Sequence, residues 1–458
     1  MTYLGIDFGT TNTVAAVMEA GDALPRVLPL DGASGTVRTA LYVERDQTMT
    51  IGRAAIQTYR VQNVGRVPRF VKKYIGTIDI ELGELLAKGY DLKGGAVIVD
   101  VFTDVDADAP GRLLHALKGP LASDYEGTSL FGKQYALEDL IAAFLEQIRI
   151  RIGSELGVLP DRAVFGRPVS FANAADQADN DKAQMRLTEA ARRAGFREVA
   201  FELEPIGAAL AFGVGTHVGG AAFVFDFGGG TLDVAVVHID THGGQQVLAT
   251  GGVGIAGDHF DQAIFKRALA PWFGARVHWG PQRLSLPSDL LAALGDWQNI
   301  PMLATAQILD FIRDAQRDCD DPPRLFALEQ LISKGYGYDV YERVEQCKTA
   351  LSGEALAIVA YETGAIDIWQ PVLRSQFEAY IASERRKIEA LVHETLARAG
   401  VSAGQIDTVV RTGGSSAIPC FVELLARIFG RDKLVEQNRF TGVASGLAVR
   451  ARDLGLRA

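Results

Sequence analysis

The stretch Asp7-Phe-Gly-Thr-Thr-Asn12 follows an apolar run at 3–6, and a related stretch, Asp226-Phe-Gly-Gly-Gly-Thr231, follows an apolar run at 222–225. A second apolar run follows each stretch, at 14–17 and at 234–237. Each copy therefore predicts a β-hairpin whose turn is made of Gly and Thr. The same hairpin in both halves of the chain indicates a duplicated fold.

Turns of this composition suit the binding of a polyphosphate. Their glycines let the backbone approach a ligand closely, and successive turn N–H groups form an anion-binding concavity. The threonine hydroxyls add further donors. Asp7 and Asp226 each end a strand, and such carboxylates suit Mg²⁺, which binds one or two carboxylates together with substrate phosphates. The pair of hairpins predicts a polyphosphate that is held from two sides.

Composition limits the classes of protein and of partner. A chain of 458 residues predicts two or more subdomains. The formal net charge of -10 argues against nucleic acid or an anionic membrane as a partner, because both attract basic surfaces. Cys319, Cys347 and Cys420 have no disulfide or metal spacing, which favours the reducing cytoplasm. No signal peptide or membrane span of ~20 apolar residues is predicted.

Hydrophobic periodicity predicts alternating helices and strands, which is typical of an α/β protein. The first half contains a predicted amphipathic helix, two strands that flank a second helix, and a helix of small residues that follows Glu204-Pro205. In the second half, a mostly helical region precedes a strand, a glycine-rich turn and another helix. The predicted helices cover 137–152, 182–194, 206–213 and most of 282–345, and the strands cover 163–165, 199–203 and 409–412.

The stretch Gly252-Val-Gly-Ile-Ala-Gly257 matches the dinucleotide-binding fingerprint. That fingerprint requires a parallel strand with an acidic residue about 20 positions later. Residues 272–281 are irregular and glycine-rich instead. A nicotinamide or flavin site is therefore not predicted.

Six motifs, in this order, resemble the nucleotide-binding domain of the seventy-kilodalton heat-shock (DnaK-like) chaperones, in particular the truncated YegD-type branch without a peptide-binding domain. The resemblance covers nearly the whole chain. The motifs are Asp7-Phe-Gly-Thr-Thr-Asn12, Val71-Lys72-Lys73-Tyr74-Ile75-Gly76, Glu204-Pro205-x-x-Ala208-Ala209, Asp226-Phe-Gly-Gly-Gly-Thr231, Glu345-x-x-Lys348-x-x-x-Ser352 and Gly413-Gly414-Ser415-Ser416-x-Ile418-Pro419.

The resemblance implies an α/β protein with the actin-like ATPase (ribonuclease H-like) fold, in which two duplicated lobes surround a central nucleotide cleft. Lobe I is expected over 1–217, with a core at 1–36 and 135–217 and a peripheral subdomain at about 37–134. Lobe II is expected over 218–439, with a core at 218–256 and 366–439 and a peripheral helical subdomain at about 257–365. Residues 440–458 are expected to form a helix that packs on lobe I.

The resemblance also implies a role for each motif, with ATP or ADP and Mg²⁺ as cofactors. Lys72 is expected near the γ-phosphate, with the adjacent Lys73 as the alternative. The expected catalytic residues are Lys72, Glu204, Asp226 and Thr231, and the expected metal-binding residues are Asp7, Asp226 and, through water, Glu204. The expected nucleotide-binding residues are Gly9, Thr10, Thr11, Asn12, Gly228, Gly229, Gly230, Thr231, Glu345, Lys348, Ser352, Gly413, Gly414 and Ser415.

Two positions depart from the family pattern. The family has arginines at the positions of Thr349 and Ala417. A planar guanidinium stacks on a base. Weaker or less selective adenine binding is therefore expected, while the phosphate half of the site is intact.

The implied function is that of a slow, Mg²⁺-dependent ATP hydrolase that acts as a nucleotide-driven switch and molecular chaperone. Its expected partners are the nucleotide and a cochaperone or client protein. Two alternatives stay open on the same fold. A small-molecule (sugar-type) kinase would need a carboxylate base aimed at a substrate hydroxyl, and an actin-like structural protein would form filaments.

Overall fold

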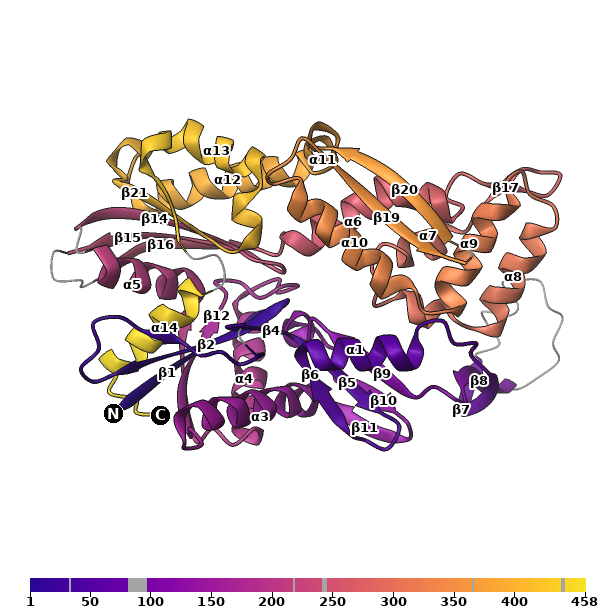
Figure 1. Ribbon diagram of the computed structural model, residues 1–458, viewed down its shortest axis with the longest axis horizontal. Helices are drawn as coiled ribbons and strands as arrows, with labels where there is room; N and C mark the ends of the chain where they lie inside the picture. Colours follow the sequence, from indigo (N-terminus) through magenta and orange to yellow (C-terminus); the bar gives the residue numbers. More distant parts are fainter. Residues whose placement is uncertain (33, 81–96, 217–218, 241–244, 365, 438–440) are drawn as a thin grey trace.

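The computed structural model describes residues 1–32, 34–80, 97–216, 219–240, 245–364, 366–437 and 441–458 (Figure 1). Two lobes, each built on a twisted sheet, lie one above the other in Figure 1, and both ends of the chain lie on lobe I. None of the helices in these ranges is both long and apolar enough to cross a membrane.

Lobe I contains a sheet in the order β13-β12-β1-β2-β3, with β4 paired to β2. The first predicted hairpin is formed by β1 and β2, which pair Ile6 with Ala15. Strands β12 and β13 run parallel to β1. The bounds are β1 Thr2–Phe8, β2 Asn12–Glu19, β3 Arg26–Val27, β4 Thr36–Arg38, β12 Arg162–Arg167 and β13 Glu198–Leu203.

Lobe II repeats this arrangement in the order β22-β21-β14-β15-β16. The second predicted hairpin is formed by β14 and β15, which pair Phe225 with Val234, and β21 and β22 run parallel to β14. The duplication predicted from the two hairpins is confirmed in the order and direction of five strands. The bounds are β14 Gly220–Phe227, β15 Leu232–Ile239, β16 Gln245–Val253, β21 Thr408–Thr412 and β22 Leu434–Glu436.

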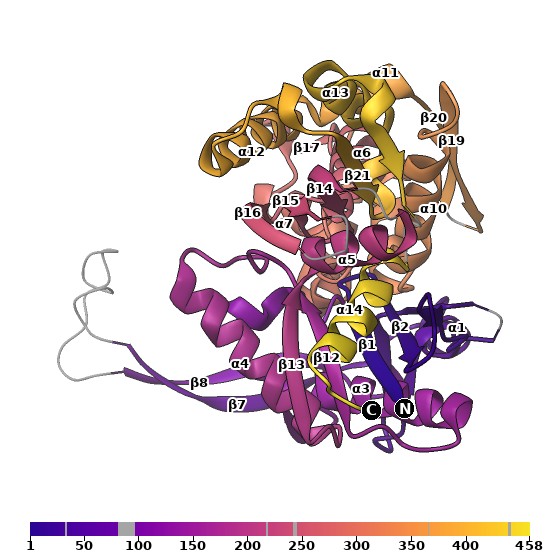
Figure 2. The ribbon, with the colours of Figure 1, turned by 90° about the vertical axis from the view of Figure 1, so that its left-hand side faces the viewer.

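Both faces of each sheet are buried, which explains why the hairpin strands are continuously apolar. On β14, Phe223 and Phe225 belong to the core of lobe II, whereas Ala222 and Val224 point to the opposite face and pack with residues of α5 and α14. Helices α5 and α14 lie between the two sheets (Figure 2). The bounds of the helices in or against lobe I are α3 Leu137–Leu156, α4 Gln177–Arg193, α5 Glu204–Thr216 and α14 Gly442–Asp453.

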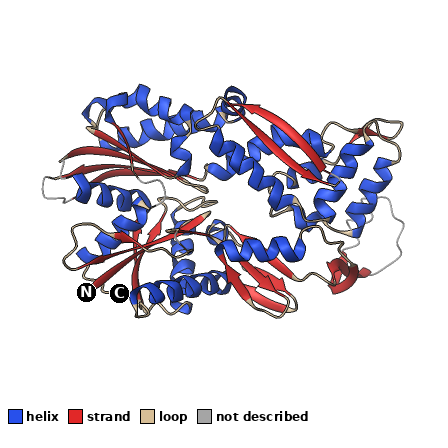
Figure 3. Cartoon of the chain, viewed as in Figure 1, coloured by secondary structure: helices blue, strands red, loops and turns tan. Residues whose placement is uncertain are grey.

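A smaller subdomain extends from each lobe (Figure 3). That of lobe I consists mainly of short strands and one helix. Its elements are β5 Ala40–Glu44, β6 Met49–Ile51, α1 Gly52–Asn63, β7 Phe70–Ile80, β8 Val97–Asp106, β9 Gly111–His115, η1 Gly119–Ala122, β10 Gly127–Leu130 and β11 Lys133–Ala136.

The subdomain of lobe II is mostly helical, as the sequence predicts for 282–345, and it is followed by the helices that cover the lobe II sheet. Its helices are α6 Gly257–Ile264, η2 Phe265–Leu269, η3 Ala270–Phe273, α7 Ser288–Ala293, η4 Ile300–Leu303, α8 Ala306–Gln316, α9 Pro322–Ser333 and α10 Gly337–Ala350. The remaining elements are β17 His278–Trp279, β18 Leu284–Ser285, β19 Leu356–Thr363, β20 Ile366–Leu373, α11 Arg374–Tyr380, α12 Ala382–Ala399, η5 Ala403–Gln405, η6 Gly414–Ala417, α13 Pro419–Phe429 and η7 Arg431–Lys433.

Two details of the sequence prediction change. The expected boundary between the subdomain and the core of lobe II, at 365/366, falls inside the hairpin formed by β19 and β20, whose residues pair from Leu356↔Leu373 to Thr363↔Ile366. The helix predicted from 182 begins at Gln177, because the side chain of Asp176 accepts a hydrogen bond from the Asp179 N–H and caps it.

Candidate functional site

A cavity of about 2170 Å³ lies between the two lobes. It is larger than the usual ~300–1,000 Å³ of a small-molecule pocket. The turns of both predicted hairpins line it, together with the Glu345 helix and the Gly413 turn. Among the predicted site residues, those that line the cavity are Asp7, Gly9, Thr10, Thr11, Asn12, Glu204, Asp226, Gly228, Gly229, Gly230, Thr231, Glu345, Lys348, Ser352, Gly413, Gly414 and Ser415.

The two hairpin turns have the same internal geometry. The N–H of Gly9 donates to the carbonyl of Asn12 at 3.1 Å, and the N–H of Gly228 donates to the carbonyl of Thr231 at 3.1 Å. A Cβ atom on Gly9 would lie 2.4 Å from the Asn12 carbonyl oxygen, so this position needs glycine. The repeated sequence thus produces a repeated backbone structure at the cleft.

The two turns meet across the cleft. A Cβ atom on Gly229 would lie 2.0 Å from Oγ1 of Thr11, and one on Gly230 would lie 2.4 Å from Oγ1 of Thr10. Oγ1 of Thr11 is buried and has no hydrogen-bond partner among the described residues. A buried hydroxyl normally finds a partner, so this one is available to a ligand such as a phosphate oxygen.

Carboxylates gather beside the turns. Burial, and then the negative charge of Glu204, raise the pKa of Asp7 to about 7. Burial, with the charges of Glu204 and Asp7, raises the pKa of Asp226 well above its ordinary value. Burial and the charge of Glu204 also raise the pKa of Asp233 to about 7. These acidic side chains repel one another, and a cation at this position would relieve the repulsion.

The residues present fit a hydrated Mg²⁺. No three acidic, His or Cys side chains of the described residues converge closely enough to hold a metal by themselves. Mg²⁺ does not require such a cage, because it keeps several waters and binds one or two carboxylates plus phosphates. Asp7 and Asp226 are the penultimate residues of β1 and β14, and both line the same cavity. Two carboxylates placed in this way suit a hydrated Mg²⁺.

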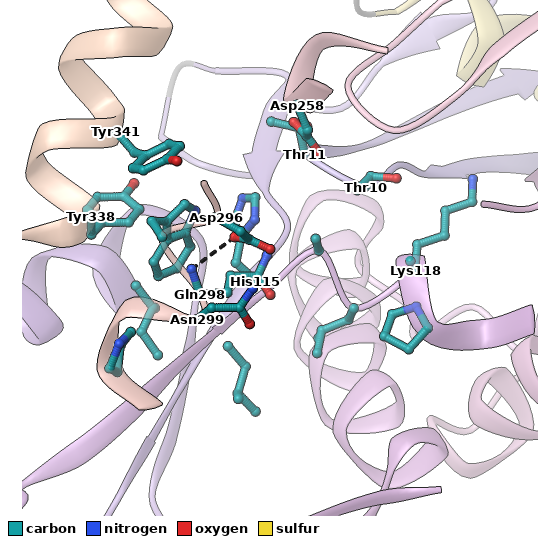
Figure 4. Close-up of a pocket in the computed structure, with 18 of the residues that line it drawn as sticks. Thr10, Thr11, His115, Lys118, Asp258, Asp296, Gln298, Asn299, Tyr338 and Tyr341 are labelled. Carbon is teal, nitrogen blue, oxygen red and sulfur yellow. Dashed lines mark hydrogen bonds between the residues drawn. The ribbon is translucent and has the colours of Figure 1, made fainter. Parts of the chain in front are cut away.

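Lys118 is the cation of this acidic cluster. Its ammonium forms a buried ion pair with Oε1 of Glu204. Burial acts to lower the pKa of Lys118, but the negative charges of Glu204 and Asp7 outweigh it and raise the pKa. Figure 4 shows Lys118 on the wall of the cavity, across from Thr10.

Lys72, the lysine predicted to be catalytic, does not lie with this cluster. It is an exposed residue of β7, where it pairs with Asp104, and it is absent from the lining of the cavity. The alternative, Lys73, lines the cavity but is also exposed. The motif at 71–76 therefore did not identify the buried lysine, Lys118. A different signal was present, because Lys118 is the only charged residue in the otherwise uncharged stretch 113–123.

Asp233 is a second residue that the sequence analysis did not identify. It lies opposite Asp226 on the paired strand. Its Oδ1 atom accepts a hydrogen bond of 2.6 Å from the N–H of Val169 in lobe I. Asp233 therefore links the second hairpin to the loop that follows β12. The sequence signal that could have identified Asp233 is the presence of a charged residue within the apolar strand β15.

The predicted ribose and adenine side of the cavity is a network of ion pairs. Nζ of Lys348 donates to Oδ2 of Asp261 at 2.6 Å and to the carbonyl of Gly257 at 3.1 Å. Nη2 of Arg38, from lobe I, lies 2.5 Å from Oε2 of Glu345. The hydroxyl of Ser415 donates to the carbonyl of Gly228 at 2.8 Å. Glu345, Lys348 and Ser415 all line the cavity, and their contact with a nucleotide stays a prediction.

The outer part of the cavity is lined by aromatic and amide side chains that were not predicted from the sequence (Figure 4). The ring of His115 lies edge-on to Trp297, with 5.7 Å between the ring centroids, and Trp297 contacts Tyr338 in the same way at 5.0 Å. Burial, and then the charge of Arg38, lower the pKa of His115 to about 4. This group brings lobe I and lobe II together in front of the turns.

Comparison with known proteins gives one family. The model of the Hsp70 protein family matches residues 122–273 and 338–455. The chaperone protein dnaK of Gracilaria tenuistipitata var. liui is 27% identical over 456 residues, which cover 98% of this chain and 60% of the relative. The chaperone protein dnaK of Guillardia theta is 27% identical over 458 residues, with 98% and 59% covered. The chain thus spans about three fifths of the length of these curated relatives.

Proposed function

This chain belongs to the Hsp70 protein family and has its actin-like ATPase fold, and we propose that it is a Mg²⁺-dependent ATP hydrolase that acts as a nucleotide-driven conformational switch. The observation that carries the proposal is the contact between the two glycine-threonine turns inside one cavity, with Asp7 and Asp226 on its walls. ATP or ADP is the proposed ligand, because a polyphosphate matches two facing turns of backbone N–H and hydroxyl donors.

The phosphates are assigned to the turns 9–12 and 228–231. Asp7 and Asp226, with Glu204 through water, would hold Mg²⁺, which neutralises charge on phosphate oxygens when bound. The unpartnered hydroxyl of Thr11 supports this assignment. Thr231 would contribute its hydroxyl from the lobe II side.

For catalysis, we propose Lys118 in place of Lys72. Phosphoryl transfer depends on positioning and on neutralising charge at the phosphate oxygens. Lys118 carries a buried ammonium held by Glu204, whereas Lys72 is exposed. The ammonium would face the terminal phosphate and donate hydrogen bonds to it and to the attacking water. Glu204 and Asp226 keep their assigned catalytic roles, the first by holding this lysine.

The nucleoside is assigned to lobe II. Glu345, Lys348 and Ser352 would contact the ribose and the base from one side, and Gly413, Gly414 and Ser415 from the other. The pair between Lys348 and Asp261 supports this assignment by fixing the ammonium at the wall of the cavity. Because Thr349 and Ala417 lack a guanidinium, we expect modest selectivity for adenine.

The division into lobes 1–217 and 218–439 is proposed as the mechanical basis of the switch. A nucleotide held by both lobes favours the closed cleft, and its hydrolysis relaxes the cleft. Chaperone activity with a cochaperone or client protein, and membership of the YegD-type branch, are part of the proposal. A cytoplasmic location is proposed from the three free cysteines, Cys319, Cys347 and Cys420. The kinase and filament alternatives gain no support from the names of the relatives.

Calorimetry followed by single-turnover hydrolysis tests this function. ATP, ADP and GTP are titrated into the protein with and without Mg²⁺, and hydrolysis of bound ATP is then followed in the same buffer. We expect ATP to bind more tightly with Mg²⁺ than without it, and Asp226→Asn to remove most of that difference. An exposed carboxylate on the same lobe, Asp367→Asn, is the matched control. Absence of nucleotide binding, or binding without hydrolysis, would refute the ATPase assignment.

A further inference from the structure

The cavity between the lobes has an outer part that the proposed nucleotide contacts do not use. The whole cavity, about 2170 Å³, is more than twice the ~1,000 Å³ at the upper end of ordinary small-molecule pockets, which leaves room for a second small molecule beside a nucleotide. Six lining residues define this outer compartment (Figure 4). They are His115, the consecutive residues Asp296, Trp297, Gln298 and Asn299, and Tyr338.

Several polar groups of the outer compartment have no partner within the described parts of the chain. The side-chain amides of Gln298 and Asn299 form no hydrogen bond there, and neither does the hydroxyl of Tyr338, a residue that is only 7% exposed. Oδ1 of Asp296 accepts a hydrogen bond of 3.0 Å from the N–H of Gln298, whereas its Oδ2 accepts none from these residues. Buried polar groups normally have partners, so this set is available to a ligand.

The charges of the outer compartment favour a neutral ligand. The carboxylate of Asp296 opposes an anion. Burial, and then the charge of Arg38, lower the pKa of His115 to about 4, so the imidazole adds no charge at neutral pH. The guanidinium of Arg60 already covers the ring of Tyr338, with 5.4 Å to the ring centroid. A cation would therefore compete with an arginine for that aromatic face.

The rings of the outer compartment form a corner and not a slot. The planes of His115 and Trp297 meet at 61°, and those of Trp297 and Tyr338 at 83°. A flat aromatic ligand prefers offset stacking on parallel ring faces, and these three rings offer no such sandwich. A corner of this kind suits the C–H groups of a non-planar ligand. The neighbouring carboxylate and amides suit hydroxyl groups, which both donate and accept hydrogen bonds.

We propose that the outer compartment binds a neutral polyhydroxylated small molecule, a sugar or a sugar alcohol. The C–H groups of this ligand pack against Trp297. Its hydroxyls donate to Asp296 and exchange hydrogen bonds with the amides of Gln298 and Asn299. Such a ligand satisfies the unpartnered groups without burying a further charge.

The ligand would contact both lobes. His115 is the last residue of β9 in lobe I, whereas residues 296–299 connect α7 to η4 in lobe II. A ligand held between them favours the closed cleft. Lys118 lies only three positions after His115 and lines the same cavity. The outer compartment is therefore a second site beside the proposed nucleotide site, and it adds a different class of ligand.

Ligand-detected NMR titrations of the full chain, without nucleotide, test the proposal. The probes are D-glucose, D-galactose, D-ribose, D-mannitol and myo-inositol. We expect saturable binding of at least one of them, with a dissociation constant below about 5 mM. Cyclohexanol, which has a ring of similar size but a single hydroxyl, should show no saturable binding, because it leaves most of the polar groups unpaired.

Variants locate the binding. The double substitution Gln298→Ala with Asn299→Ala should weaken binding of the sugar or polyol at least about tenfold, because both amides lose their hydrogen bonds to it. The control is Gln282→Ala, an exposed glutamine of the same subdomain that does not line the cavity. The two amides have no partner among the described residues, so melting temperatures within about 2 °C of the wild type are expected for both variants.

Three outcomes overturn the proposal. The first is no saturable binding of any of the five probes up to about 50 mM. The second is equal binding by the wild type and the double variant, which would place the ligand elsewhere. The third is binding of choline or of adenine, but of none of the five probes, that the double variant loses, which would assign the outer compartment to a cation or to a flat base. These titrations contain no nucleotide, so their failure is distinct from failure of the proposed ATPase.

Discussion

At the scale of single residues, the buried ammonium of Lys118 lies among several acidic side chains in the cleft. Lys118 pairs with Glu204, and burial together with the charge of Glu204 raises the pKa values of Asp7 and Asp233 to about 7. A group that is buried and surrounded by opposite charge is the kind that serves in catalysis. Removal of the Lys118 ammonium should therefore affect ATP turnover far more than removal of an exposed lysine.

We predict that Lys118→Ala lowers the single-turnover rate of ATP hydrolysis at least about a hundredfold, because the transition state loses a positioned positive charge. The matched control is Lys72→Ala, which should stay within about twofold of the wild type. Nucleotide affinity, measured by calorimetry, should change less than the rate does. The opposite ranking, with Lys72→Ala inactive and Lys118→Ala active, would restore the assignment made from the motif.

His115 gives a prediction for the dependence of stability on pH. The pKa of this imidazole is lowered to about 4 in the fold, against about 6.5 when unfolded. As the pH falls below 6.5 the unfolded chain binds a proton that the folded chain refuses, so folding stability is lost on acidification. His115→Gln removes this loss. Between pH 7.5 and pH 5, the free energy of unfolding of the wild type should therefore decrease by about 2 kcal/mol more than that of the variant.

Urea unfolding of both proteins at the two pH values measures that difference. Only the difference between wild type and variant is informative. The carboxylates whose pKa values are raised in the fold increase folding stability on acidification, and this effect is present in both proteins. Equal changes in the two proteins would mean that His115 does not titrate as assigned. His238→Gln, at an exposed histidine near the end of β15, is the control substitution.

At the scale of elements, the crossing of α5 and α14 sets how closely the two sheets approach. A Cβ atom on Gly446 of α14 would lie 1.6 Å from the carbonyl oxygen of Gly207 in α5. A Cβ atom on Gly5 of β1 would lie 2.3 Å from the backbone N of Ala448. Backbone cannot move aside as a side chain can, so small residues at these positions are a condition of the fold.

We predict that Gly446→Ala destabilises the protein by about 3 kcal/mol or more, because the overpacking outweighs the helix propensity of alanine, a gain of about 1 kcal/mol. Denaturant unfolding measures the effect. Gly21→Ala is the control, since a Cβ atom there would meet nothing within 4 Å, and its effect should stay within about 0.5 kcal/mol. Equal stabilities of the two variants would contradict the described packing of α5 on α14.

At the scale of the whole molecule, ion pairs cross the mouth of the cleft from lobe I to lobe II. Nε of Arg60 in α1 lies 2.8 Å from Oδ1 of Asp339, and its Nη2 lies 2.5 Å from Oε2 of Glu342, both in α10. Arg38 reaches Glu345 in the same way. The hydroxyl of Tyr59 adds a hydrogen bond of 3.1 Å to the carbonyl of Gly335. These contacts favour the closed cleft.

We predict that Arg60→Ala speeds release of bound ADP by roughly three- to tenfold, since two partly exposed ion pairs contribute about 1 kcal/mol together. Stopped-flow measurement with a fluorescent ADP analogue gives the rate. Arg193→Ala is the matched control, because Arg193 also forms two ion pairs but both partners, Asp139 and Glu189, lie in its own lobe. Release that is unchanged by Arg60→Ala would show that the cleft opens without breaking these pairs.

Local patterns sufficed to predict the two hairpins, several of the helices and strands behind them, and many of the residues that line the cavity. The duplicated hairpins, the helix over 137–152 and the Glu345-Lys348-Ser352 face depend on spacing along the chain, and spacing is visible in a sequence. Residues that make tight turns were also predicted, because Gly9 is required by backbone geometry that only nearby residues determine.

The sequence by itself determined that this chain forms two similar halves, each with a glycine-threonine turn after an aspartate. Only the tertiary structure decided which lysine enters the acidic cluster, because Lys118 and Glu204 lie 86 positions apart and meet through the packing of separate elements. The same holds for the pair Arg38–Glu345, whose partners are 307 positions apart. Periodicity reports the neighbours of a residue along the chain, whereas charge pairing in a cleft depends on how whole lobes come together.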